Sequence, residues 1–308
     1  MLVRISGMRN GIATAVLTCL TIASAIVAAS GQDNPAASKE QNLERTHAPA
    51  ASEFLVLPLH VYRAKSADVA EIDCRQLSDD DIRRIVTKAN VIWASAGIHW
   101  QLESIEDVQA ENTGRVKLAA LIDADDDEAP GKKPAKNARL PHAAFRRVIP
   151  ESTRKDTNVF RVHYIHDFDV NGVYFGNREA MVKETAALRK VESGIDEPLP
   201  RVTSHELGHA LGLPHRQDTL NLMASGTTGT FLNEDEMRKA REIARANPAC
   251  RTVDSLEKEG KSSGEDRKAM ISRTLRSVRA LAGKRIHPVL DFDFAAFERA
   301  ILPEPARP

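Results

Sequence analysis

The chain has 308 residues, of which 43 are Lys or Arg and 43 are Asp or Glu, so its formal net charge is zero. A pI near 7.2 argues against nucleic acid as a partner, because domains that bind nucleic acid are usually basic. A hydrophobic fraction of 42% with 28% charged residues is ordinary for a globular protein. This composition excludes full disorder, a collagen-like repeat and a polytopic membrane protein.

The first 31 residues have the layout of an export signal. Arg4 and Arg9 precede an uncharged run of apolar and small residues over 11–29, and small residues continue to Gly31. This order is typical of a secretory signal peptide, so we predict a secreted or periplasmic protein. The alternative is a retained membrane anchor, because the run is close to the roughly 18 residues that a span needs. After cleavage we expect no stable membrane span, and the remaining chain has two more acids than bases.

The rest of the chain divides by composition into three parts. Residues 32–52 are small and polar without an apolar period, which predicts a flexible leader. Residues 53–250 carry strand and helix patterns and form the predicted globular domain. Residues 251–308 are charged and helical in pattern, and we expect them to form a C-terminal appendage.

Apolar periodicity predicts the elements of the globular domain. Ser78 followed by three aspartates is a strong helix start, since a side-chain oxygen caps free N–H groups and acids suit the positive helix end. Apolar residues then recur at helical spacing until Gly97. The expected strands are 54–62, 98–102, 159–165, 172–176 and 180–184, and the further expected helices are one entered through Pro198 and Pro200 and one near 233–246.

Residues 123–140 form a polar segment in which acids precede bases, as is typical of a solvated loop. Asp123, Asp125 and Asp127 have the early spacing of a calcium-binding loop. However, Glu128 stands where that loop needs glycine, and Pro134 stands where it needs a bidentate glutamate. We therefore expect no calcium site.

The cysteines form one candidate pair. Cys19 leaves with the signal, so that Cys74 and Cys250 remain. An even count in an exported protein predicts one disulfide, and the polar sequence neighbours of both residues indicate a surface position. Two buried free thiols are the alternative.

Residues 205–215 carry the chemistry: His-Glu-Leu-Gly-His-Ala-Leu-Gly-Leu-Pro-His. His205 and His209 are four residues apart, so a helix would place both rings on one face, near enough to share one ion. Gly212 lets the chain leave the helix, and the following turn would bring His215 back as a third ligand. Three nitrogen ligands with one open position are typical of catalytic zinc rather than structural zinc. Glu206 would reach a water on the metal without binding the metal itself.

A second motif follows eight residues after His215, where Met223 lies within Asn-Leu-Met-Ala-Ser-Gly. With both motifs the chain resembles a metzincin metalloprotease, whose extended zinc motif is followed by a methionine-containing turn. The resemblance covers roughly 53–250 and implies that Met223 supports the site from beneath the zinc. The short spacing is similar to that of matrixins. Arg216 and the lack of a tyrosine after Met223 depart from other metzincin groups.

The resemblance implies an α+β catalytic domain with a twisted, mostly parallel sheet, an antiparallel edge strand, an active-site helix and a C-terminal helix. The edge strand would be Gly172–Gly176, and a peptide or protein substrate would bind along its free N–H and C=O groups.

The expected function is a secreted zinc-dependent endopeptidase with one catalytic zinc ion. Water on zinc would attack the peptide bond, and Glu206 would act as the general base. One alternative is a secreted zinc-binding or adhesion module without turnover, against which the intact Glu206 argues. Another is a metallo-aminopeptidase.

Two further features have structural readings. His163 and His166 lack ligand spacing, so we interpret them as structural or exposed. Residues 267–285 contain seven bases and no acid, with an apolar stripe at helical spacing. Such a basic amphipathic helix would contact anionic surfaces or, as we favour, pack against its own protein.

Overall fold

The computed structural model describes residues 47–114 and 145–302. The predicted signal, most of the predicted leader and the segment of Asp123, Asp125 and Asp127 lie outside these residues. In the described ranges, no helix combines the length and apolar character needed to cross a membrane.

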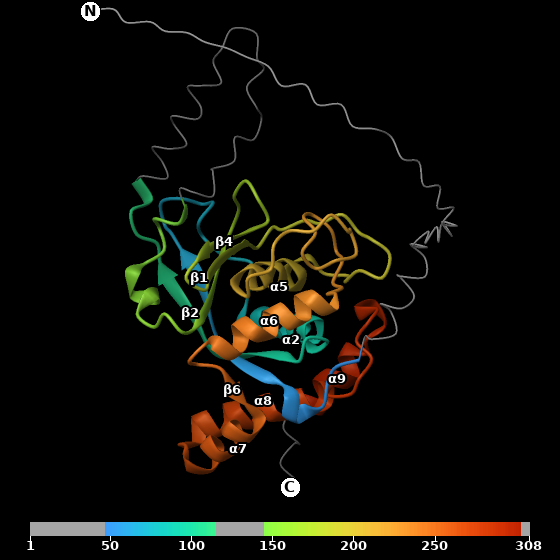
Figure 1. The fold of residues 1–308 in the computed structure, drawn as a ribbon. Helices are drawn as coiled ribbons and strands as arrows, with labels where there is room; N and C mark the ends of the chain where they lie inside the picture. Colours follow the sequence, from blue (N-terminus) through green and yellow to red (C-terminus); the bar gives the residue numbers. More distant parts are fainter. Residues whose placement is uncertain (1–46, 115–144, 303–308) are drawn as a thin grey trace, which may run out of the picture.

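A mixed six-stranded sheet forms the centre of the fold (Figure 1). Its main path is β2-β1-β3-β5-β4, and the short β6 pairs antiparallel with β1. Neighbouring strands are parallel from β2 to β5, whereas β4 is an antiparallel edge strand beside β5. The predicted mostly parallel sheet is thus confirmed. The strands are β1 Leu55–Lys65, β2 Ile98–Gln109, β3 Phe160–Ile165, β4 Gly172–Gly176, β5 Glu179–Lys183 and β6 Arg251–Thr252.

The predicted helix start at Ser78 is confirmed. Ser78 Oγ accepts a hydrogen bond from the Asp81 amide, the Asp81 carboxylate accepts one from the Ser78 amide, and Gly97 turns the chain with a φ of 62°. The α-helices are α2 Asp79–Ala94, α5 Pro198–Ala210, α6 Glu234–Ala246, α7 Val253–Ser262, α8 Glu265–Leu281 and α9 Phe294–Ile301. Short 3₁₀ turns lie at Ala51–Glu53, Glu151–Arg154 and Val289–Asp291.

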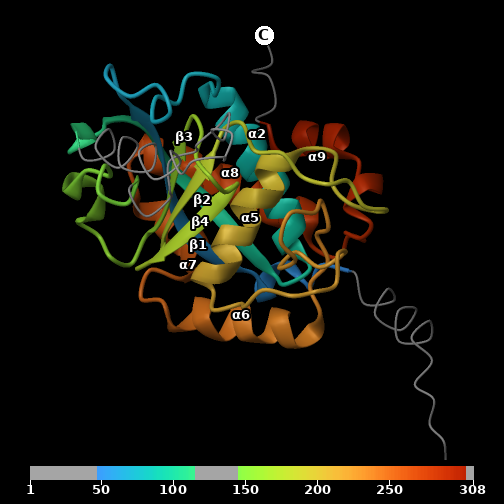
Figure 2. The same ribbon diagram turned by 90° about the horizontal axis from the view of Figure 1, so that it is seen from above.

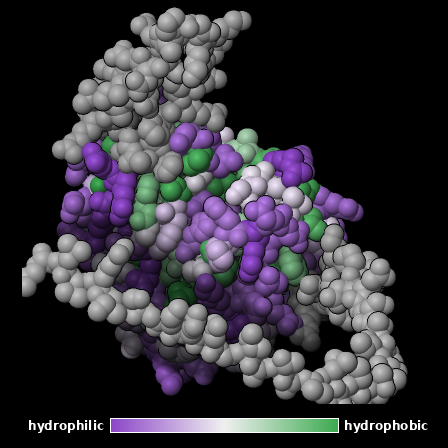
Figure 3. All heavy atoms as spheres, turned by 45° about the horizontal axis from the view of Figure 1, so that its top comes forward, coloured by the Kyte–Doolittle hydropathy of each residue, from purple (hydrophilic) through white to green (hydrophobic). Residues whose placement is uncertain are grey.

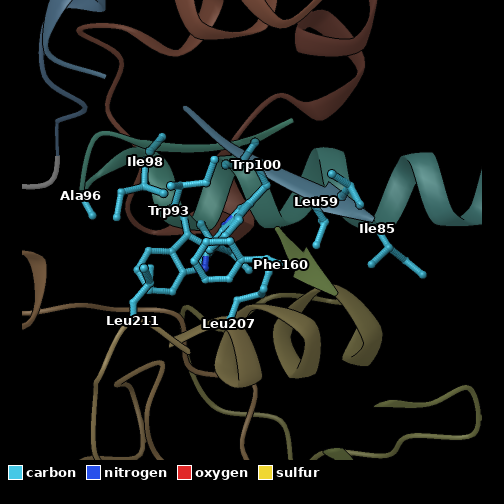
Figure 4. Packing of buried hydrophobic residues seen from close by; sticks show 14 of the residues in the cluster. Leu59, Ile85, Trp93, Ala96, Ile98, Trp100, Phe160, Leu207 and Leu211 are labelled. Carbon is cyan, nitrogen blue, oxygen red and sulfur yellow. The ribbon is translucent and has the colours of Figure 1, made fainter. Parts of the chain in front are cut away.

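The main core lies between the sheet and the helices α2 and α5, which pack against each other (Figure 2). Trp100 of β2 makes edge contacts with Trp93 of α2 and Phe160 of β3, at centroid distances of 6.0 and 5.0 Å. Leu207 and Leu211 approach this aromatic group from α5 and the turn that follows it (Figure 4). The aromatic core therefore fixes α5, which carries the zinc motif, against the sheet.

The C-terminal segment packs into the same core. Apolar side chains of α7, α8 and α9, including Leu256, Val278 and Phe297, belong to the cluster that contains the β1 side chains. The apolar stripe of the basic helix, now α8, is buried at Ile271 and Leu281, so this helix packs against its own protein as we favoured.

Hydrophilic residues cover most of the described surface on the face in Figure 3, and hydrophobic residues form small separate patches. The large hydrophobic residues that are exposed among those described are Val170, Ile243, Leu290 and Leu302.

The predicted disulfide is wrong, because Cys74 and Cys250 are both free. The Cys74 amide bonds to the Ala64 carbonyl near the end of β1, whereas Cys250 directly precedes β6, which pairs with Val56 near the start of β1. Eight residues of strand separate these positions by about 26 Å, and a disulfide needs Cα atoms within about 7 Å. Cys74 is fully buried and donates from Sγ to Glu184 Oε2 at 3.2 Å. Polar sequence neighbours were therefore a poor guide to its burial.

Candidate metal centre

Helix α5 carries His205, Glu206 and His209, and its ends are fixed by the local sequence. Pro198 occupies the first helical position, where a missing N–H costs no intrahelical bond. At the other end Gly212 has a φ of 77°, and the Leu213 amide reaches back to the Gly208 carbonyl at 3.0 Å. A left-handed glycine with this backward bond ends a helix and reverses the chain. The reversal returns the following residues, including His215, to the helix.

The three predicted ligands come together. One nitrogen from each of His205, His209 and His215 lies within 4.8 Å of the other two. The Nε2 atoms of His209 and His215 are 3.0 Å apart. The sequence prediction of a three-histidine cluster therefore corresponds to a real juxtaposition in the fold.

The donor set fits a zinc ion. His205 Nδ1 lies 2.8 Å from the Leu222 carbonyl oxygen, and His209 Nδ1 lies 2.8 Å from the Leu213 carbonyl oxygen. A carbonyl oxygen only accepts, so each Nδ1 must carry the proton and each Nε2 keeps its lone pair for a metal. Backbone carbonyls that fix the histidine tautomer are typical partners of metal-binding histidines.

Burial also favours the neutral rings that bind metals. It lowers the pKa of His205 to about 3 and lowers the pKa of His209 as well. Neutral imidazole is the form that binds zinc, so neither ligand has to lose a proton near neutral pH.

Glu206 lies buried beside the histidines, at the edge of the sheet. Its side chain faces β4 so closely that a Cβ atom on Gly172 would lie 2.6 Å from Glu206 Oε1. Burial raises the pKa of Glu206 to about 8, and the nearby charge of Arg201 opposes the shift. The predicted general base and the predicted substrate strand are therefore in direct contact.

A cleft of about 780 Å³ opens at this point. The three histidines and Glu206 line it, together with the first half of β4 and residues of the loops around Val170, Leu188 and Ser225. The three histidines are therefore accessible from the cleft.

Met223 lies beneath the helix. It is fully buried, and a Cβ atom on Gly208 would lie 2.6 Å from Met223 Sδ. The Met223 amide donates to Asn221 Oδ1 at 2.6 Å, which holds the turn. Met223 therefore contacts helix α5 at Gly208, next to His209. Its role as a support for the metal site stays a prediction.

Arg216, which departs from the metzincin pattern, is exposed but pairs with a buried carboxylate. Its Nε donates to Glu236 Oε1 at 2.7 Å, and Asn221 Nδ2 donates to Glu236 Oε2 at 2.8 Å. Glu236 is only 1% exposed, and its Oε2 also accepts from the Asn233 amide. One carboxylate of α6 thus joins the residue after His215 to the turn of Met223. The capping pattern Asn-Glu-Asp-Glu over 233–236 was the available signal for Glu236, and the sequence interpretation missed it.

Arg201 is a second residue that the sequence interpretation missed. It lies one helical turn before His205 and is almost fully buried. Its guanidinium donates to the carbonyl oxygens of Gly229 and Ala224, which flank the turn of Met223. Its spacing of four residues from His205 was the only signal in the sequence.

The other two histidines do not join the cluster. His163 is fully buried, stacks on Tyr62 with ring centroids 5.0 Å apart, and lies 3.3 Å from a Glu179 oxygen. His166 Nδ1 lies 2.7 Å from Glu184 Oε1. These contacts agree with the structural interpretation of both residues.

No family model matches the chain, and no curated protein matches it significantly. Among solved structures, archaemetzincin from Methanopyrus kandleri is 12% identical with a TM-score of 0.34, over 61% of this chain and 96% of that one. A zinc-dependent peptidase from Methanocorpusculum labreanum is 15% identical with a TM-score of 0.27, over 60% and 99%. A chaperone–substrate complex reaches 12% and 0.34, over 63% of this chain and 36% of that one. Likeness at this level decides neither fold family nor activity.

Proposed function

We propose that this protein is an exported zinc-dependent endopeptidase of the metzincin type. The observation that carries the proposal is the convergence of three histidine nitrogens beside a buried glutamate, in a cleft next to an open strand edge. His205, His209 and His215 would hold the metal, which leaves one position of a tetrahedral zinc site open. Export rests on the signal-like layout of residues 1–31.

The mechanism follows from the positions of the side chains. Bound zinc would supply Lewis-acid polarisation of the scissile carbonyl and would make a water more acidic. In its ionised form, which the charge of Arg201 favours, Glu206 accepts the proton of the attacking water and then delivers it to the leaving amine. The backbone of Gly172 stands against Glu206, and this close packing holds the carboxylate in place.

Substrate would extend the sheet at β4. This strand pairs with β5 on one side, and its half-buried residues line the cleft on the other. An extended peptide added there would gain main-chain hydrogen bonds. Pockets of the protein that receive alternate side chains of the peptide would give specificity. Binding in the middle of a chain, rather than at its end, favours endopeptidase action.

The test combines metal analysis with cleavage of blocked peptides. We expect about one zinc per purified chain, cleavage of peptides whose termini are acetylated and amidated, and loss of cleavage with a chelator. Glu206→Gln should keep the zinc and lose about 10²–10⁴-fold in kcat, the usual contribution of a general base. Full activity in that variant would contradict the role of Glu206.

The outcomes separate the alternatives. Zinc binding with no cleavage of any peptide would indicate a binding module. Cleavage restricted to peptides with a free amino terminus would indicate an aminopeptidase. N-terminal sequencing of the exported protein would show whether the signal is removed.

A further inference from the structure

Arg201 is a buried cation in the wall of the catalytic cleft. Its side chain is only 2% exposed, and the residue lines the cleft together with His205 and Glu206. Residues four apart on a helix share a face, so Arg201 stands one turn along α5 from the first zinc ligand. A peptide bound over the histidines would therefore pass close to this guanidinium.

Hydrogen bonds occupy only part of the guanidinium. Nε donates to the Gly229 carbonyl at 3.2 Å, and Nη2 donates to the carbonyls of Ala224 and Asn221. Nη1 has no partner among the described residues, and it is not among the enclosed side-chain atoms that lack one. Nη1 is therefore not fully enclosed, and Arg201 is one of the residues that line the cleft.

The charge of Arg201 is not neutralised by a direct ion pair. In the part of the chain that the structure describes, its bonds go to backbone carbonyls, and Glu206 acts on it only through space. Burial lowers the pKa of Arg201 to about 10, so the group stays charged near neutral pH. A buried charge without a counter-ion is costly, and at a cleft it is a candidate for recognition.

The surrounding walls indicate which side of the scissile bond Arg201 faces. A substrate antiparallel to β4 would place its N-terminal part along the strand toward Gly176 and its C-terminal part beyond Gly172. Val170, Leu188 and Gly226 line the cleft beyond Gly172. The segments of Leu188 and Gly226 are joined by the bond from the Arg189 amide to the Gly226 carbonyl at 2.9 Å. Arg201 binds the loop that contains this wall.

We infer that Arg201 makes the cleft select substrates with a carboxylate just C-terminal to the scissile bond. The carboxylate would accept hydrogen bonds from Nη1, and the opposite charges would make these bonds stronger than bonds between neutral groups. Two sources share this chemistry: an Asp or Glu side chain on the residue after the cut, or the free C-terminal carboxylate of a short product or peptide. The inference rests on the proposed peptidase activity and adds the substrate class to it.

The test compares matched peptides that differ at one group. One pair carries Glu or Gln directly after the cleavage site, within blocked peptides, and the other pair ends one or two residues after it as a free acid or an amide. A buried charge-assisted hydrogen bond predicts that kcat/KM is about 10- to 100-fold higher for the acid of at least one pair. Preference in the first pair identifies a side chain, and preference in the second identifies a chain end.

Variants then connect the preference to the residue. In Arg201→Gln the ratio of kcat/KM for the Glu and Gln peptides should fall to about one, whatever the absolute rate of the variant, and Arg201→Lys should keep part of the preference. Lys239→Gln is the control, because Lys239 is the other cation of the cleft but lies exposed on α6. We expect this variant to keep the preference.

The results that would overturn the inference differ from those that would overturn the proposed peptidase activity. Equal chelator-sensitive cleavage of both members of each pair overturns the inference while leaving the peptidase proposal intact. A preference that disappears in Lys239→Gln rather than in Arg201→Gln also overturns it. No cleavage of any peptide overturns the peptidase proposal itself. The peptide comparison uses the unaltered protein, so it decides the matter even where Arg201→Gln does not fold.

Discussion

Replacing Gly172 by alanine should disable the site through a single added methyl group. A Cβ atom at this position would lie 2.6 Å from Glu206 Oε1, 2.8 Å from Val202 Cγ1 and 2.9 Å from Glu206 Cγ. Real Cβ contacts are not this short, so the Glu206 side chain would have to move. Gly172 does not have a positive φ, so the effect would come from contact and not from backbone strain.

The size of the effect follows from the displaced group. General-base catalysis contributes about 10²–10⁴-fold, so Gly172→Ala should lose a comparable factor in kcat. Overpacking of this kind costs about 1–3 kcal/mol of stability, which leaves the protein folded. The three heavy atoms nearest to the new methyl group belong to Glu206 and Val202 and not to a histidine, so zinc content should stay near that of the unaltered protein.

The assay measures kcat on a blocked peptide, zinc by metal analysis, and the thermal midpoint of the same preparation. Gly264→Ala is the matched control, because its Cβ meets nothing within 4 Å and its φ of −64° suits alanine. Activity of Gly172→Ala equal to that of Gly264→Ala would refute the packing of Glu206 against β4. Loss of zinc together with activity would show that the methyl group acts through the ligands instead.

Two further predictions concern buried glutamates. Glu236→Gln should release zinc about 10- to 100-fold faster than the exposed control Glu242→Gln in a chelator competition, because Arg216 after the third ligand loses its ion partner; equal rates would contradict a positioning role. For Glu184, burial raises the pKa but hydrogen bonds, led by the one with His166, lower it further, to a net decrease. A group whose pKa is lower in the folded state stabilises the protein at pH values above its unfolded pKa, here about 4.3. This stabilisation is lost as the pH falls through the folded pKa. As the pH falls below about 4.3, the free energy of unfolding, measured by urea titration, should therefore decrease less for Glu184→Gln than for the unaltered protein. Parallel plots of unfolding free energy against pH for the two proteins would contradict this.

Strands and helix starts were predictable from local physics. The alternation of Ile98, Trp100 and Leu102 marks a strand, and the cap of Ser78 marks a helix, since both signals lie within a few residues. The partners of buried polar groups were not predictable in this way. Cys74 was predicted near the surface because its neighbours are polar, yet the fold buries it against Glu184, 110 residues along the chain.

In the candidate site, too, the residues placed by short-range structure were predictable and those placed by tertiary contacts were not. The spacing of His205, His209 and His215 predicts their convergence, because a helix and a glycine turn are short-range structures. Glu236 has a helix-capping pattern and Arg201 has its spacing from His205, but neither signal predicts the residue's role, because that role depends on which loop the fold brings against it. A charged residue in a helix is more often solvated, and only the burial of both reveals their contacts.

Helix α5 explains why residues outside the zinc motif control its geometry. Every residue from Leu199 to Gly208 is buried, so no exposed stripe fixes how the helix is rotated. Its rotation must come from particular contacts: Tyr164 with Thr203 at 2.7 Å, Gly208 against Met223, and Arg201 on the loop carbonyls. A small rotation would move the ligand nitrogens apart and turn Glu206 away from β4. Metal affinity, proton transfer and substrate selection therefore depend on one packing arrangement, so changes at these contacts should alter all three together.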